Sequence, residues 1–133
     1  MQLICVDPSR VREFWPHVGS LLRAACYRTK LISFDDLEME VLEGDGLLWI
    51  VWSGSGVEAA VTTSLINTDA GKVCIITACA GSDMKHWLPL IEQIENYAKN
   101  EGCYCVRIYG RKGWLHVLDG YKAEHVIMDK ELA

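Results

Sequence analysis

The chain has 133 residues, half of them apolar and about a quarter charged, which is the composition of one globular domain. Its formal net charge of −5 argues against nucleic-acid binding, because domains of that class usually present a basic face. No apolar run approaches the roughly 20 residues that a membrane-spanning helix needs. The N-terminus lacks a signal-peptide pattern, so we expect a cytoplasmic protein that forms one domain over residues 1–133 and contacts neither nucleic acid nor membrane.

Hydrophobic periodicity and turn residues predict the elements in chain order. The first part contains a strand at Gln2–Val6, a helix from Asp7 to Arg28 that Pro16 breaks or kinks after Trp15, and a helix at Phe34–Glu43. Then come strands at Leu47–Trp52, Val57–Ile66 and Val73–Cys79, a helix that starts near Lys85 to Trp87, and a strand at Cys103–Tyr109. A short helix at Trp114–Leu118 and a closing strand at Lys122–Leu132 end the chain.

Two helix starts carry capping residues. Asp7 can cap the first helix, and Pro8 fits its first position, where the missing N–H costs nothing. Ser33 opens the next helix as S-x-x-D, a weaker form of the capping box. The strands at residues 47–79 are joined by short turns, so we expect them to be antiparallel. The helix after residue 85 connects the strand at Val73–Cys79 to the strand at Cys103–Tyr109, which predicts that these two are adjacent and parallel.

The central stretch runs from Gly71 to Gly102 and reads as a buried strand, a small-residue loop and an amphipathic helix. Proline is tolerated only in a first helical turn, so Pro89 leaves residues 81–85 as an ordered loop. Free backbone N–H groups at such a loop can bind a phosphate, and Lys85 and His86 add donors. The alternative is that the unit binds nothing, since neither GxxxxGK[ST] nor GxGxxG is present.

Six cysteines occur without any C-x-x-C spacing: Cys5, Cys26, Cys74, Cys79, Cys103 and Cys105. A structural zinc site needs paired ligands on turns, so we expect no metal site. In a cytoplasmic chain these residues are expected to be reduced and mostly buried small hydrophobic side chains.

The element order β-α-α-β-β-β-α-β-α-β, with a central strand, loop and long helix, resembles the GNAT N-acetyltransferase family over nearly the whole chain. The C-terminal stretch GRKGWLHVLDGYKAEHVIMDKEL looks like the small acetyltransferase-like proteins encoded by tailed phages and prophages. The resemblance implies an α/β (α+β) fold with a mixed, mostly antiparallel central sheet and helices on both faces. It also implies acetyl-CoA as cosubstrate and no metal.

In that family the fourth strand pairs with the pantetheine arm, and the following loop holds the diphosphate. The matching cofactor-binding residues are Thr77, Ala78, Cys79, Ala80, Gly81, Ser82, Asp83, Met84, Lys85 and His86, with Arg111 and Lys112 for a further phosphate. The family's Q/R-x-x-G-x-G/A pattern is not kept, because one glycine is present and Asp83 adds a negative charge. If Gly81 holds a positive φ or lies against the ligand, Gly81→Val is expected to abolish CoA binding with little change in melting temperature.

The family's general acid is often a tyrosine in the short helix before a Gly-aromatic pair, and counting back from Gly120-Tyr121 places His116 there. His116 could protonate a leaving thiolate, or it could be an exposed helical histidine. Glu38, Glu40 and Glu58 are candidate bases by location only, each with a solvated surface charge as the alternative.

Two functions remain open at this point. The first is an acyl-CoA-dependent N-acyltransferase that transfers the acyl group directly to a small-molecule or protein amine. The second is a non-catalytic module of the same fold, of phage origin, in a virion or at a host protein, because fold alone does not fix function. The acceptor is not readable from the sequence, and a homodimer is an open alternative to a monomer.

Overall fold

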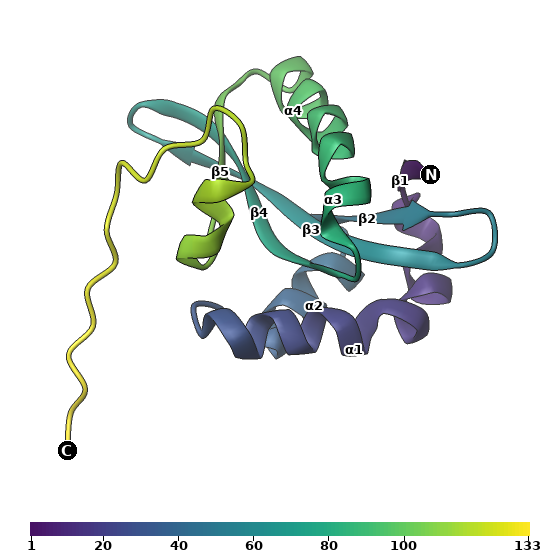
Figure 1. Ribbon diagram of the computed structural model, residues 1–133, viewed down its shortest axis with the longest axis horizontal. Coiled ribbons are helices and arrows are strands. Elements are labelled where there is room, and N and C mark those ends of the chain that lie inside the picture. Colours follow the sequence, from purple (N-terminus) through teal and green to yellow (C-terminus); the bar gives the residue numbers. More distant parts are fainter.

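The computed structural model describes residues 1–133 and shows one twisted five-stranded sheet with helices on both faces (Figure 1). The strands are β1 (Gln2–Cys5), β2 (Gly46–Trp52), β3 (Val57–Thr68), β4 (Gly71–Gly81) and β5 (Cys103–Ile108). The α-helices are α1 (Val11–Thr29), α2 (Phe34–Leu42), α3 (Met84–Trp87) and α4 (Ile91–Asn100). Three short 3₁₀ segments are η1 (Pro8–Arg10), η2 (Leu88–Leu90) and η3 (Lys112–His116).

The strands lie in the spatial order β1-β2-β3-β4-β5. Strands β1 to β4 pair antiparallel, whereas β4 and β5 pair parallel, with Lys72 opposite Cys103 and Ile76 opposite Ile108. The expected α/β fold with a mixed, mostly antiparallel sheet is therefore confirmed, including the parallel pair that the crossover helix predicts.

Two hydrophobic clusters fill the two faces of the sheet. Helices α1 and α2 cover one face, and α3 and α4 cover the other (Figure 1). Alternation along β2 sends Ile50 into the first cluster and Trp49 into the second. The Trp49 indole donates to the Thr63 hydroxyl at 3.0 Å and meets the Tyr97 ring edge-on, so this tryptophan belongs to the core.

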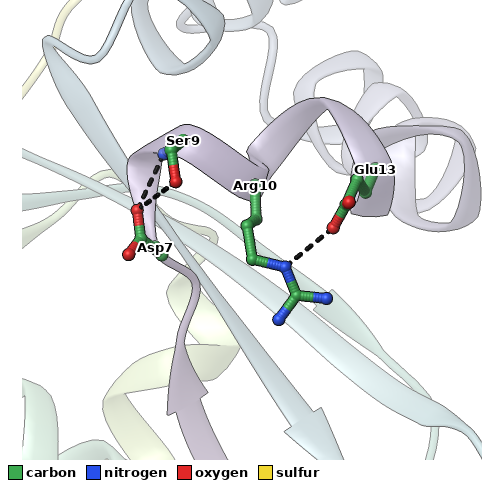
Figure 2. Close-up of polar contacts among 4 residues, drawn as sticks. All are labelled: Asp7, Ser9, Arg10 and Glu13. Carbon is green, nitrogen blue, oxygen red and sulfur yellow. Dashed lines mark hydrogen bonds and ion pairs between the residues drawn. The ribbon is translucent and has the colours of Figure 1, made fainter.

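The chain enters α1 through a capped turn, as Figure 2 shows. Asp7 accepts hydrogen bonds from the Ser9 backbone N–H at 2.9 Å and from the Ser9 hydroxyl at 2.7 Å. Arg10 Nε then donates to Glu13 at 2.8 Å on the exposed surface. The predicted cap at Asp7 is confirmed, although it caps the 3₁₀ segment η1 that leads into α1.

Of the two outcomes expected at Pro16, a break or a kink, the break is wrong, because α1 continues through Pro16 to Thr29. Pro16 is exposed, so water can reach the Arg12 carbonyl that lacks its helical partner. The buried stripe on the opposite face, which includes Val18 and Leu22, holds the helix together. The capping prediction at Ser33 is confirmed, since its hydroxyl accepts from the Asp36 N–H at 3.4 Å.

Two further expectations are corrected. The helix after β4 is not continuous: the single turn α3 passes into η2, which contains Pro89, and α4 begins only at Ile91. The closing strand expected at Lys122–Leu132 is absent, and this segment runs away from the body of the protein (Figure 1). A strand exists only through pairing, and alternation of side chains does not supply a partner. No helix combines the length and the apolar character that crossing a membrane requires.

Candidate functional site

Strands β4 and β5 part before β4 reaches its end. The parallel ladder ends at Ile76 and Ile108, but β4 continues to Gly81 beside β3 alone. From Thr77 to Gly81 the β4 edge on the β5 side therefore has no strand partner. An unpaired strand edge offers backbone donors and acceptors to an extended ligand.

A β-bulge at Thr77 accounts for this divergence. Thr62 pairs with Ala78 and Thr63 pairs with Ile76, which leaves Thr77 as the extra residue of β4. Such a bulge bends its strand and increases the local twist. The Thr77 hydroxyl lies 2.7 Å from the Thr62 hydroxyl and donates to the Thr62 carbonyl at 3.2 Å. The buried side chain of Thr77 therefore fixes the bulge, and its backbone contributes to the free edge.

The space beside this edge is a cleft with a cavity volume of about 90 Å³. Its lining is mostly apolar: Ala25, Arg28, Thr29, Ile76, Thr77, Ala78, Cys79, Ala80, Gly81, Met84, Trp87, Ile108, Tyr109, Arg111 and Trp114. No Asp, Glu, His or Lys lines it. The cleft is thus an apolar slot with two guanidinium groups and one phenol.

Arg28 and Arg111 give the cleft a positive charge in a chain whose formal net charge is −5. Arg28 stands in the last turn of α1, and Arg111 follows β5 just before η3. The ion pairs of the structure join Arg10 to Glu13 and His86 to Asp83, so neither cleft arginine has a carboxylate partner. Both guanidinium groups are therefore available to an anionic ligand.

Tyr109 and Cys79 are the other ionisable side chains of the cleft. Burial raises the pKa of the Cys79 thiol to about 12, so this thiol stays protonated at neutral pH. A protonated thiol is a weak nucleophile, which argues against a covalent intermediate on Cys79. Tyr109 follows β5 directly and is half-buried, so its hydroxyl can serve as a proton donor.

The loop after β4 is shorter than expected. Gly81 still belongs to β4, and α3 begins at Met84, which leaves only Ser82 and Asp83 between them. The Ser82 carbonyl accepts from the Trp87 indole at 2.9 Å, and Asp83 adopts the left-handed region with φ 53°. The Asp83 carboxylate pairs with the His86 imidazole, so these two side chains engage each other at the loop.

Diphosphate binding on the backbone of residues 81–86 stays a prediction. The electrostatic attraction that the N-terminus of α3 can offer a phosphate is weaker than that of a long helix. The helix macrodipole grows with aligned peptides, and α3 contains a single turn. The Asp83 carboxylate also lies at its start, where it would oppose an anion. The unpaired positive charges of the cleft lie instead on Arg28 and Arg111.

Gly81 is required by packing and not by backbone conformation. It is absent from the glycines with positive φ, which corrects one of its two expected roles. A Cβ at position 81 would lie 2.4 Å from the Ala59 Cβ and 2.7 Å from the Glu58 carbonyl oxygen. The glycine therefore allows β4 to pair closely with β3 at Ala59.

The structure brings part of the expected cofactor set into the cleft. Thr77, Ala78, Cys79, Ala80, Gly81, Met84 and Arg111 line it, whereas Ser82, Asp83, Lys85, His86 and Lys112 do not. None of the expected catalytic residues lines it either. His116 is exposed on η3, and Glu38 accepts a hydrogen bond from the Trp15 indole at 2.7 Å. Glu58 precedes the β3 residue that pairs with Gly81, and their catalytic roles stay predictions.

Sequence reasoning missed Ala25, Arg28 and Thr29 of α1, together with Tyr109 and Trp114, as cleft residues. A signal for Tyr109 existed: parallel strands end at the same edge, so residues that follow β5 approach the end of β4. Nothing in the sequence places the last turn of α1 there, because that contact depends on how α1 crosses the sheet.

No model of a known protein family matches the sequence, and no curated protein matches it. Solved structures do match the fold. An aminoglycoside acetyltransferase from an uncultured soil metagenomic sample, solved with sisomicin, has a TM-score of 0.69 at 11% identity over 99% of this chain and 95% of its own. A proposed acetyltransferase from Pyrococcus furiosus has a TM-score of 0.68 at 20% identity over 98% and 100%. A predicted acetyltransferase from Clostridium acetobutylicum, solved with acetyl-CoA, has a TM-score of 0.63 at 11% identity over 96% and 95%.

The chain has the fold of these acetyltransferases. The match extends over nearly the full length of both chains in each case, so the shared fold includes the sheet and both helical layers. At such low identity the likeness establishes the fold alone, and chemistry has to be argued from the cleft.

Proposed function

We propose that this protein is an acyl-CoA-dependent N-acyltransferase that uses acetyl-CoA and transfers the acyl group directly to an amine. The observation that carries the proposal is the free edge of β4 from Thr77 to Gly81, opened by the bulge at Thr77 and facing an apolar cleft. The structural neighbour solved with acetyl-CoA shares this fold and supports the choice of cosubstrate.

The chemical groups of the cleft are complementary to the successive parts of acetyl-CoA. The pantetheine arm is an extended chain with two amides, and the backbone groups of β4 can pair with such a chain as with a strand. The phosphates are anions, and the guanidinium groups of Arg28 and Arg111 are the unpaired cations of the cleft. Apolar side chains such as Ile108 and Trp114 line the remaining wall.

The cosubstrate supplies an acyl thioester, from which an amine can take the acyl group. The departing sulfur needs a proton, and the Tyr109 hydroxyl is the cleft group that can donate it. Cys79 would remain a protonated bystander because burial raises its pKa to about 12. No carboxylate or imidazole lines the cleft, so the amine has to arrive neutral or lose its proton to water.

A non-catalytic module of the same fold, of phage origin, is the second candidate. The cavity volume of about 90 Å³ favours it, because ligand sites usually measure roughly 300–1,000 Å³. The absence of a base from the lining points the same way. On this second proposal the scaffold would serve a protein contact in a virion or at a host protein.

Calorimetric titration with acetyl-CoA separates the two. We expect binding by the wild-type protein and a roughly 10- to 100-fold weaker affinity for Arg111→Gln, the loss of one hydrogen-bonded charge of about 1.5–3 kcal/mol. Lys112→Gln is the matched control, since Lys112 is the neighbouring cation outside the cleft and its affinity should stay at the wild-type value. No binding by the wild-type protein at millimolar acetyl-CoA would leave the non-catalytic module as the function.

A further inference from the structure

The side chains of β4 change faces of the sheet at Thr77. Before the bulge, Cys74 and Ile76 belong to the hydrophobic cluster beneath α3 and α4. After it, Ala78 and Ala80 belong to the cluster beneath α1 and α2. In a regular strand all four would lie on one face, because alternate residues point the same way. The bulge reverses the alternation, and burial on both faces prevents the strand from slipping into a regular register.

Three threonines are the buried polar side chains of the molecule, and all three lie at this bulge. Thr62 and Thr63 are the β3 residues between which the register shifts, and Thr77 is the extra residue of β4. The Thr63 hydroxyl accepts the indole N–H of Trp49 at 3.0 Å, whereas the Thr62 and Thr77 hydroxyls lie 2.7 Å from each other. Because a buried hydroxyl needs a hydrogen-bond partner, these contacts constrain the geometry of the bulge.

The direction of both hydrogen bonds between Thr62 and Thr77 follows from the single proton that each hydroxyl carries. The Thr77 hydroxyl donates to the backbone carbonyl of Thr62 at 3.2 Å, which uses its proton. In the 2.7 Å contact between the hydroxyls, Thr62 is therefore the donor and Thr77 the acceptor. The side chain of the extra residue is thus held at two points of one β3 residue. Its hydroxyl proton is not available to a leaving group in the cleft.

We propose that Thr62 is a positioning residue for the acyl donor, which acts through the Thr77 hydroxyl on the free edge of β4. The inference rests on the proposed function, in which that edge pairs with the pantetheine arm. Thr77 is the first residue of the edge, and as the extra residue of a bulge it has no partner residue on β3. The hydroxyl pair fixes its torsions, so the backbone groups that follow keep one direction toward the cleft. Thr62 is fully buried and does not line the cleft, so it contributes geometry without touching the donor.

Calorimetric titration with two probes separates positioning from a general loss of stability. Thr62→Val should weaken acetyl-CoA binding by about 3- to 10-fold, the equivalent of one neutral hydrogen bond. It should leave the affinity for adenosine 3′,5′-bisphosphate unchanged, because this nucleotide lacks the pantetheine arm. Thr62→Ser keeps the donor and should bind acetyl-CoA as the wild type does. Thr63→Val is the matched control, since it removes the other buried hydroxyl of β3 and should lower the melting temperature without changing acetyl-CoA affinity. An unchanged acetyl-CoA affinity in Thr62→Val, or an equal loss in Thr63→Val, would overturn the proposal.

Backbone amide relaxation dispersion by NMR, without any ligand, tests the hydroxyl pair separately from the proposed function. We expect flat profiles at residues 77–79 in the wild type, Thr62→Ser and Thr63→Val. In Thr62→Val we expect exchange on the microsecond-to-millisecond timescale there, because the extra residue then samples more than one conformation. Flat profiles in Thr62→Val would refute the proposal even in a protein that binds acetyl-CoA. The expected profiles in a wild-type protein that binds no acetyl-CoA would instead refute the proposed function, and with it the role of Thr62 in donor binding.

Discussion

Tyr109 is the proton-donating side chain that the cleft places beside the free edge of β4. The phenol sits at the point where the chain leaves β5, directly after Ile108 has made the last pair of the parallel ladder. Its position is therefore set by backbone pairing and not by a flexible loop. The expected acid, His116, lies on the exposed surface of η3 instead.

Replacing Tyr109 by Phe tests this assignment at the level of one hydroxyl. We expect kcat for acetyl transfer to fall by about 10²–10⁴, the usual contribution of a positioned general acid. The affinity for acetyl-CoA should change little, because the ring that lines the cleft is retained. Tyr104→Phe, on the preceding strand β5, is the matched control, since Tyr104 is exposed and outside the cleft. Unchanged turnover in Tyr109→Phe, or an equal loss in Tyr104→Phe, would assign proton donation to another group.

At the scale of elements, the cleft depends on how β4 relates to its two neighbours. The bulge at Thr77 turns β4 away from β5, and the absence of a side chain at Gly81 keeps it close to β3. The free edge exists because both conditions hold along the same five residues. We therefore revise the expectation that Gly81→Val would leave the melting temperature nearly unchanged.

We now expect Gly81→Val to lower the melting temperature as well as ligand affinity. A side chain there meets the Ala59 Cβ and the Glu58 carbonyl below van der Waals distance, so β3 and β4 must separate at this point. Overpacking of this kind costs about 1–3 kcal/mol, which differential scanning calorimetry resolves. Gly113→Val is the control, because no atom lies within 4 Å of its Cβ and its φ is not positive. A melting temperature for Gly81→Val that equals the wild-type value would contradict the close approach to β3.

The elements that sequence reasoning predicted correctly are those with a local signal. Turn chemistry and side-chain alternation gave three successive antiparallel strands, and the long crossover gave the parallel neighbour β5. The helix interruption at Pro89 was missed because the apolar stripe continues in register on both sides of it. The strand expected at residues 122–132 failed for another reason, since its alternation is real but no partner lies beside it in one chain.

The same distinction between local signals and long-range contacts decides which residues of the cleft could be predicted from the sequence. The β4 residues of the cleft follow from the place of that strand in the order of elements. Arg28 and Thr29 could not be assigned from sequence, because α1 reaches the cleft only through its packing across the sheet. Such contacts join residues that are far apart in the sequence, and no local sequence pattern encodes them.

For the whole molecule, the positive charge of the cleft contrasts with the negative net charge of the chain. The formal net charge is −5, yet the charged side chains of the cleft are both arginines. The core beneath the cleft contains ionisable groups that stay neutral at physiological pH. Burial raises the pKa of Cys74 and Cys79 to about 12, from an ordinary value of 9.0. For Cys74 the neighbouring thiols Cys103 and Cys105 add to the effect of burial.

These buried thiols predict a loss of stability in alkaline solution. The folded protein keeps their protons between about pH 9 and pH 12, whereas the unfolded chain releases them from pH 9 upward. Because the unfolded state then binds fewer protons, the free energy of unfolding falls as pH rises through this window and is unaffected by these groups below it. Tyr97 acts in the same direction, since burial raises its pKa to about 12 from 10.0.

Urea unfolding followed by tryptophan fluorescence at pH 8, 9, 10 and 11 measures this dependence. We expect the urea midpoint to begin to fall as the pH approaches 9, the ordinary pKa of these thiols, and to fall more steeply above pH 9. Cys79→Ala should make the fall shallower by removing one of the titrating groups, while its cost from lost packing should be the same at every pH. The slope of the urea midpoint against pH therefore reports the loss of the titrating thiol, and the constant offset between the two proteins reports the loss of packing. A slope above pH 9 that is equal in wild type and Cys79→Ala would mean that the Cys79 thiol is not protonated preferentially in the folded state.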